Sequence, residues 1–304
     1  MKTLLEVLQS GTDYLARQGC GEARATMQHL MAHVLHCNRT ALYSQFDKPV
    51  EEAQLEPLRE LLKRKAAGEP LQHLLGSTEF FRRDFLTDAR ALIPRPETEE
   101  LVEMVLNRIP SRPVRVLDMG TGSGIIGITL ALELKERARE VVLADISPQA
   151  LDLALENAMR LGAKVSTIQT DLFENIPLSK QNTPQDGEET QPNAPVGVSE
   201  DAGQEMRFDA IVANLPYIAE GEELSPEVMR DPHTALFGGP RGWEVIERFL
   251  SRARDYLNEN GFIALEIGYD QAPTVTQIMD GYGYNYIEVQ KDMSGIARFP
   301  FAYR

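Results

Sequence analysis

The chain has 304 residues, a formal net charge of −15 and two cysteines, Cys20 and Cys37. This length accommodates two domains with a substantial core, and two cysteines exclude both a disulfide scaffold and a four-cysteine metal site. An acidic chain repels bulk nucleic acid unless it carries a local basic patch. We find no signal peptide and no apolar run long enough to cross a bilayer. We therefore expect a cytoplasmic monomer that acts on a protein or small molecule, with no direct nucleic-acid partner, no membrane contact and no metal.

Residues 1–72 have the pattern of amphipathic helices, because apolar residues recur at helical spacing and no run alternates like a strand. The recurring residues include Leu4, Leu8, Leu15, Leu30 and Val34. Gly68-Glu69-Pro70 has turn chemistry near the end of this part. The pattern predicts a small all-helical domain over 1–72. The basic run Lys63-Arg64-Lys65 is interpreted as a solvated helix face.

Residues 73–95 contain two short β-prone runs, 79–81 and 91–93, separated by charged residues. These runs predict a β-hairpin linker. Pro96 then fits the first turn of a helix, with acids near the positive end of the helix dipole.

In the remaining part, 96–304, strand and helix patterns alternate. The strand candidates are 114–119, 140–145, 165–169, 208–213, 262–267 and 284–290. This alternation predicts a mainly parallel, doubly wound α/β sheet, and the last two candidates are expected to form an antiparallel edge. The segment 179–206 is polar, with almost no large apolar residue, and is predicted to be a disordered insertion.

A glycine loop follows the first of these strands. Its residues are Gly120, Thr121, Gly122, Ser123 and Gly124. Glycines let the backbone approach a ligand closely, and the helix that follows points free N–H groups at it. Such loops bind NAD, FAD and S-adenosylmethionine alike, so the loop alone does not identify the ligand.

Acids at three successive strand ends narrow the choice of ligand. Asp118 precedes the loop, Asp145 ends the second strand, and Asp171 follows the third. Asp145 is placed to take both ribose hydroxyls and Asp171 the adenine amino group, with Leu172 against the ring. Three acids suit an adenosine with a cationic tail better than a pyrophosphate, although acids of this kind also cap helices.

The strand at 208–213 runs into Asn214-Leu215-Pro216-Tyr217. The Asn214 side-chain oxygen and the Leu215 carbonyl are candidate acceptors for the two N–H groups of an amide or amine. Pro216 keeps Leu215 extended, and Tyr217 offers a flat face to a planar group. Taken alone, the same four residues are also compatible with a simple strand-ending turn.

Four segments resemble the bacterial HemK-type methyltransferases, which modify a glutamine of class I peptide-chain release factors. The segments are 68–76 (GEPLQHLLG), 92–99 (LIPRPETE), 116–124 (VLDMGTGSG) and 265–268 (LEIG). The resemblance implies a helical amino-terminal domain, a hairpin linker and a Rossmann-like class I methyltransferase domain. It also implies S-adenosylmethionine as methyl donor, the glutamine of the Gly-Gly-Gln loop as acceptor, and N5-methylglutamine as product.

The resemblance assigns roles to named positions. The cofactor-binding residues that it implies are Gly120, Thr121, Gly122, Ser123, Gly124, Asp145, Leu172 and Asn214, to which the strand-end position adds Asp171. The catalytic turn is Asn214, Leu215, Pro216 and Tyr217, and the same four residues with Arg95 are assigned to the substrate.

The chain departs from the family pattern in three places. Leu215 stands where the family has proline, Arg82 stands where it usually has glycine, and the insertion 179–206 is unusual. Leu215 keeps the carbonyl acceptor but loses a locked φ, which predicts slower turnover rather than inactivity. Two alternatives stay open: a nucleic-acid adenine N6-methyltransferase, and a release-factor-binding protein with weak or no catalysis.

Overall fold

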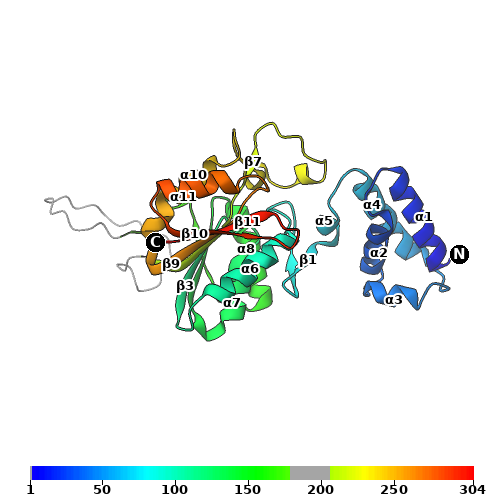
Figure 1. Ribbon diagram of the computed structural model, residues 1–304. Helices are drawn as coiled ribbons and strands as arrows, with labels where there is room; N and C mark the ends of the chain where they lie inside the picture. Colours follow the sequence, from blue (N-terminus) through cyan, green and yellow to red (C-terminus); the bar gives the residue numbers. More distant parts are fainter. Residues whose placement is uncertain (1, 179–205) are drawn as a thin grey trace, which may run out of the picture. The chain divides into compact units, whose positions relative to one another are not determined.

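The computed structural model describes residues 2–178 and 206–304 (Figure 1). The chain divides into two compact units. The first runs to Pro94 and includes Glu222–Leu236, and the second comprises Arg95–Gly221 and Phe237–Arg304. The predicted disordered insertion lies, except for Met206, outside the described residues. The division into domains at residues 72 and 95 stays a prediction.

The first unit is built on helices, as predicted for residues 1–72. They are α1 (Leu4–Arg17), α2 (Ala23–Val34), α3 (Arg39–Tyr43), α4 (Glu52–Ala66) and α5 (Leu71–Leu75). Thr3 and Glu6 form a capping box that satisfies free N–H groups at the start of α1. The spaced leucines form a common core, with Leu4, Leu15 and Leu30 almost completely buried. Burial of these side chains is the main stabilising term for helices this short.

The basic run on α4 is not uniformly solvated, so the sequence-based interpretation is wrong for Lys65. Its side chain is 3% exposed and pairs with Glu227, while Arg64 pairs with Glu69. Arg230 also donates to the Ala67 carbonyl, at 3.1 Å. Both Glu227 and Arg230 belong to the segment Glu222–Leu236, which contains η2 (Val228–Arg230) and α9 (His233–Leu236). A buried lysine needs such a partner, and sequence spacing could not reveal one so far along the chain.

The linker contains a hairpin of β1 (Ser77–Phe80) and β2 (Arg83–Leu86), paired antiparallel. The run 91–93 is not a strand, contrary to the prediction. Ala91 and Ile93 are buried, so the apolar pattern of this run reflects burial in the core and not strand pairing. The two turn residues, Phe81 and Arg82, have φ values of 48° and 62°. A two-residue turn with positive φ at both positions matches the twist of the strands but is unfavourable for residues other than glycine and asparagine.

Replacing Arg82 with glycine should therefore stabilise the protein. Glycine adopts the left-handed conformation without strain, and this gain in free energy is larger than the loss caused by a more flexible unfolded chain. The net increase in the free energy of unfolding should be about 1 kcal/mol. Thermal unfolding of the full chain measures it, and Arg83→Gly, one residue into the strand, is the control expected to destabilise. An unfolding temperature for Arg82→Gly at or below that of the wild type would contradict this account.

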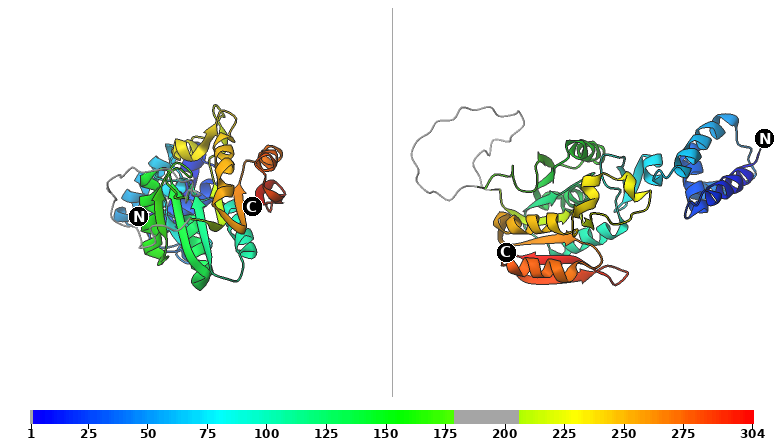
Figure 2. Two further views of the ribbon diagram at one scale, coloured as in Figure 1. Left: turned by 90° about the vertical axis from the view of Figure 1, so that its left-hand side faces the viewer. Right: turned by 90° about the horizontal axis from the view of Figure 1, so that it is seen from above.

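The second unit is a seven-stranded sheet in the order β10-β11-β9-β6-β3-β4-β5. The strands are β3 (Val114–Met119), β4 (Ala138–Asp145), β5 (Ser166–Gln169), β6 (Phe208–Asn214), β9 (Leu257–Glu266), β10 (Asn285–Lys291) and β11 (Ala297–Tyr303). The helices are α6 (Pro96–Arg108), α7 (Ile125–Leu134), α8 (Pro148–Leu161), α10 (Glu244–Ala253) and α11 (Ala272–Gly281). Helices α6, α7 and α8 cover one face, and α10 and α11 the other (Figures 1 and 2). The predicted doubly wound α/β sheet is confirmed.

The antiparallel edge differs from the prediction. Strand β9 is parallel to β6, and β11, which the sequence pattern did not indicate, lies between β9 and β10 and is antiparallel to both. Pro300 in the middle of β11 argued against a strand, because proline lacks the N–H that a ladder uses. A short pair, β7 (Ile218–Ala219) and β8 (Phe237–Gly239), completes the unit. Among the described helices, none combines the length and apolar character needed to cross a membrane.

Candidate functional site

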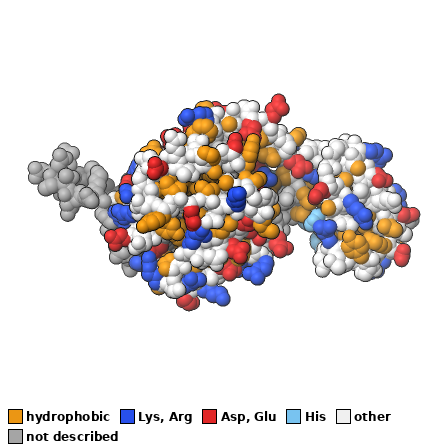
Figure 3. All heavy atoms as spheres, viewed as in Figure 1, with side chains coloured by type: hydrophobic (Ala, Val, Ile, Leu, Met, Phe, Trp, Pro, Cys, Tyr) orange, Lys and Arg blue, Asp and Glu red, His pale blue; other side chains and the backbone are white. Residues whose placement is uncertain are grey.

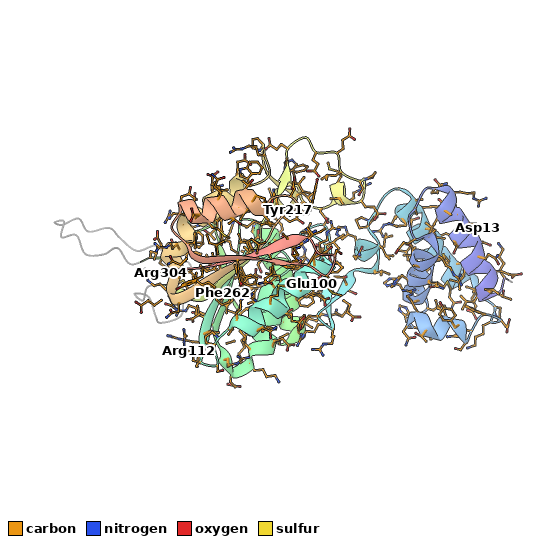
Figure 4. All side chains as sticks on the ribbon, viewed as in Figure 1. Asp13, Glu100, Arg112, Tyr217, Phe262 and Arg304 are labelled. Atoms are coloured by element: carbon orange, nitrogen blue, oxygen red, sulfur yellow. The ribbon has the colours of Figure 1, made fainter. Side chains whose placement is uncertain are left out.

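The site residues predicted from the sequence in the second unit lie at or just after the carboxyl ends of neighbouring strands. In the parallel register, Met119 lies opposite both Ala144 and Ala213, Asp145 lies opposite Gln169, and Asn214 lies opposite Glu266. Figure 4 shows Tyr217 and Glu100 toward this end of the sheet, and Arg112 and Arg304 toward the other. The carboxyl ends of parallel strands are where open α/β sheets bind ligands.

Asp118, at the end of β3, holds the glycine loop through hydrogen bonds. This carboxyl group is fully buried, and its Oδ2 accepts hydrogen bonds from the Thr121 hydroxyl at 2.6 Å and the Gly127 N–H at 2.8 Å. Burial raises the pKa of Asp118 to about 6. Asn157, on α8, donates to the Ser123 carbonyl at 2.9 Å. The sequence analysis did not identify Asn157, because an asparagine inside a helix carries no local sign of such a role.

Glycine is required where the loop enters α7. Gly124 has a φ of 84°, and a Cβ there would lie 2.6 Å from Ile128 Cδ1 and 3.1 Å from Ala154 Cβ. The loop therefore lies close to α8, with the first N–H groups of α7 directed toward the edge of the sheet. This arrangement leaves backbone donors available to an anionic group of a ligand.

Asp145 joins the glycine loop to the end of β4. It is 9% exposed, its Oδ2 accepts from the Gly122 N–H at 2.8 Å, and its Oδ1 accepts from the Ser147 N–H at 2.9 Å. Burial raises its pKa despite these bonds. The Ile146 N–H is a third backbone donor to this carboxylate, so of its four lone pairs one remains to accept a ligand hydroxyl while Asp145 holds the loop.

Asp171 and Leu172 follow β5. Asp171 Oδ2 pairs with Arg248 of α10 at 2.8 Å, which leaves its other carboxylate oxygen for further bonds. Leu172 has a φ of 49°, and its carbonyl accepts from the Thr170 hydroxyl at 3.0 Å. A left-handed leucine is strained, and such strain is concentrated at functional sites. The pairing with Arg248 was not anticipated from the sequence.

The Asn214–Tyr217 turn packs against the glycine loop. Leu215 is 4% exposed, and a Cβ on Gly120 would lie 3.0 Å from Leu215 Cδ2. A Cβ on Gly238 would lie 2.4 Å from the Pro216 carbonyl oxygen. Gln271 Nε2 donates to the Tyr217 carbonyl at 2.8 Å. Close contacts therefore enclose the turn and restrain its backbone conformation.

Asn214 belongs to a buried chain of hydrogen bonds. Its Nδ2 donates to Thr98 Oγ1 at 3.3 Å, and the Thr98 hydroxyl donates to Glu266 Oε2 at 2.7 Å. Thr98 is completely buried and Glu266 is 2% exposed. The segments LIPRPETE and LEIG contain both residues, but the sequence analysis gave neither a role. Their spacing along the chain offered no sign that they meet.

Glu266, Arg95 and Arg298 influence the ionisation of Tyr217 in the Asn214–Tyr217 turn. Burial raises the pKa of Tyr217 to about 12, the Glu266 carboxylate adds to this shift, and Arg298 and Arg95 oppose it. The phenol is therefore neutral at physiological pH and does not serve as a base. Arg95 is the residue before the first turn of α6. Arg298 donates to Asp292 at 2.9 Å and to the Ile267 carbonyl at 3.3 Å.

Burial raises the pKa of Glu266 to about 7 from the ordinary value of 4.5. The folded chain then keeps a proton that the unfolded chain loses, so the free energy of unfolding should fall as pH rises from about 4.5 to about 7. Glu266→Gln should lack this contribution, which amounts to at most about 3 kcal/mol.

Urea unfolding of both proteins at pH 5 and pH 8 checks this. Asp118 contributes a slope of the same sign in each protein, so the difference between the two slopes isolates Glu266. Identical pH dependence would show that Glu266 is ionised normally in the folded chain.

Comparison with known proteins adds to this geometry. Residues 6–76 match the PrmC N-terminal domain, and residues 110–187 match a methyltransferase domain. A release factor glutamine methyltransferase from Geobacter sulfurreducens is 37% identical, covering 97% of this chain and 95% of the relative. Proteins of the same name from Koribacter versatilis and Rhodopirellula baltica are 35% and 33% identical, each over 97% of this chain and over 96% and 94% of their own lengths.

Proposed function

Because the chain belongs to the release factor glutamine methyltransferase family, we propose that it methylates the N5 amide nitrogen of the glutamine in the Gly-Gly-Gln loop of class I peptide-chain release factors. The observation that carries the proposal is the Asn214–Tyr217 turn beside the glycine loop, with Leu215 packed beneath Gly120. The contact between the turn and the loop supports the proposal that an amide substrate and a nucleoside cofactor bind side by side.

The residues present fit S-adenosylmethionine as the cofactor. Asp145 keeps a free lone pair for a ribose hydroxyl, and Asp171 keeps one oxygen for the adenine amino group, with Leu172 beside it. Asp118 lies behind Gly120 to Gly124, and above its raised pKa of about 6 its buried carboxylate favours a cationic ligand there. When bound, the cofactor supplies an activated methyl group on a sulfonium.

The turn acts on the substrate amide. The Asn214 side-chain oxygen and the Leu215 carbonyl accept hydrogen bonds from the two N–H groups, and Tyr217 packs on the amide plane with Arg95 nearby. Positioning supplies much of the rate of such an in-line displacement, on the order of 7–11 kcal/mol in favourable cases. With the cofactor bound, the methyl group would pass from sulfur to the amide nitrogen, the sulfur leaving as a neutral thioether, and the nitrogen would release its acidified proton to water. No strong base is needed, in agreement with the neutral Tyr217.

The proposal includes a monomeric enzyme that acts in the cytoplasm on protein rather than nucleic acid. The net charge of −15 supports a protein substrate. On the face of the second unit in Figure 3, basic and acidic side chains are interspersed, and neither sign forms a continuous area. An extended basic stripe, which nucleic-acid enzymes use to contact phosphates, is not seen on that face.

The test is methyl transfer from radiolabelled S-adenosylmethionine to purified release factor, beside the same factor with its loop glutamine changed to alanine, and beside bulk RNA and DNA. We expect label on the wild-type factor alone. Asn214→Ala should lower the rate by about 10²–10³-fold, as loss of one preorganised hydrogen-bonding group does elsewhere. Asn285→Ala, at an exposed position on β10, is the matched control and should leave the rate unchanged. Label on nucleic acid would favour the adenine methyltransferase, and cofactor binding without transfer would favour the non-catalytic protein.

Leu215 allows a separate prediction about turnover. Leu215→Pro should keep or raise the rate, because proline restricts φ and preorganises the turn, an effect worth about 0.4–1 kcal/mol of folding free energy. The smaller proline ring also loses part of the leucine packing, so this variant should be less stable than the wild type. Leu215→Ala tests the packing instead and should destabilise the fold by about 2–5 kcal/mol through loss of the buried side chain. Rates and urea unfolding of the two variants separate the effects, and a tenfold slower Leu215→Pro would contradict the role given to φ.

A further inference from the structure

We propose that Thr98, held by Glu266, is a positioning residue that fixes the orientation of the Asn214 side-chain amide so that its oxygen faces the substrate. This inference rests on the proposed function and extends the site to two residues that do not touch the substrate. Thr98 is completely buried and Glu266 is 2% exposed, so both act through Asn214.

The fold brings the three residues together from distant parts of the chain. Asn214 and Glu266 are register partners at the ends of the parallel strands β6 and β9, so their side chains leave the sheet on the same face. That face is covered by α6, and Thr98 is the third residue of this helix. The first turn of α6 thus places a hydroxyl beside both side chains.

The direction of the hydrogen bonds determines which way the amide points. A threonine hydroxyl has one proton to donate, and here it goes to Glu266 Oε2 at 2.7 Å. While Glu266 accepts this proton, Thr98 Oγ1 acts as an acceptor toward Asn214, and the Asn214 side chain also hydrogen-bonds the Glu266 carboxylate. The only donor on the asparagine side chain is Nδ2, which lies 3.3 Å from Thr98 Oγ1.

Rotation of the amide by 180° would remove this arrangement. Asn214 Oδ1 would then face Thr98 Oγ1, two acceptors without a proton between them, in a buried place where unsatisfied polar groups are unfavourable. The same rotation would present N–H groups to the N–H groups of the substrate amide. The observed orientation instead leaves Oδ1 on the side away from Thr98, available to accept.

Loss of the Thr98 hydroxyl should therefore lower the rate of methyl transfer. It should not change cofactor binding, which depends mainly on the glycine loop, Asp145 and Asp171. Thr98→Val keeps the shape of the side chain but lacks the hydroxyl, and Thr98→Ser keeps the hydroxyl. We expect kcat to fall by about 10–100-fold in Thr98→Val, a size typical of a misplaced reacting group. In Thr98→Ser we expect kcat within about threefold of the wild type, and in both variants a Kd for S-adenosylmethionine within about threefold.

Thr129→Val provides the matched control. Thr129 is also completely buried in a helix of the same unit, and its hydroxyl has no hydrogen-bond partner among the described residues. Loss of this hydroxyl should leave kcat unchanged. Equal loss of kcat in Thr98→Val and Thr129→Val, or an unchanged kcat in Thr98→Val, would overturn the inference.

A second measurement does not depend on the substrate. In protein labelled with 15N-asparagine, the side-chain N–H₂ signals of Asn214, assigned from their loss in Asn214→Ala, should shift in Thr98→Val and stay near their wild-type positions in Thr98→Ser. If the wild type transfers no methyl group to release factor, the proposed function fails while the spectra still report on the orientation. If it transfers normally and the Asn214 signals are the same in both Thr98 variants, the positioning role fails alone.

Discussion

The parallel register between β6 and β9 is the constraint on which the rest of the site depends. It sets Asn214 beside Glu266 at one sheet edge, next to the strand that leads into the glycine loop. Side chains alternate between the two faces of a strand, so a slip of one residue would turn Asn214 toward the opposite face. The strands are buried on both faces between the helices, so a slip would exchange the side chains packed against the two helix layers, and close packing disfavours that exchange.

Several acidic side chains are buried at this end of the sheet. Asp118, Asp145 and Glu266 are all nearly inaccessible, and burial raises the pKa of each. Their hydrogen bonds go to backbone N–H groups and hydroxyls, which orient the glycine loop and the Asn214 turn. Burial of these carboxyl groups costs desolvation free energy, and their hydrogen bonds restrain the glycine loop and the turn of the proposed site.

The Asn214–Tyr217 turn also has a covalent link to the first unit. Directly after β7 the chain enters Glu222–Leu236, which pairs with α4 through Lys65 and Glu227. Lys65 is buried and Glu227 is half exposed, so loss of Glu227 would leave the lysine charge buried without its partner. The chain passes between the two units at three points, 94/95, 221/222 and 236/237, and the last two are the ends of this segment.

Local chemistry allowed the sequence alone to predict the helices of 1–72, the doubly wound sheet, the glycine loop and the Asn214 turn, because each depends on neighbours within a few residues. The strand β11 escaped prediction because Pro300 contradicted its local pattern. The chain from Asn214 through Thr98 to Glu266 joins residues 116 and 168 positions apart. Such pairings, like Lys65 with Glu227, were decided only by the tertiary structure, since a buried polar group takes whichever partner the packing brings to it.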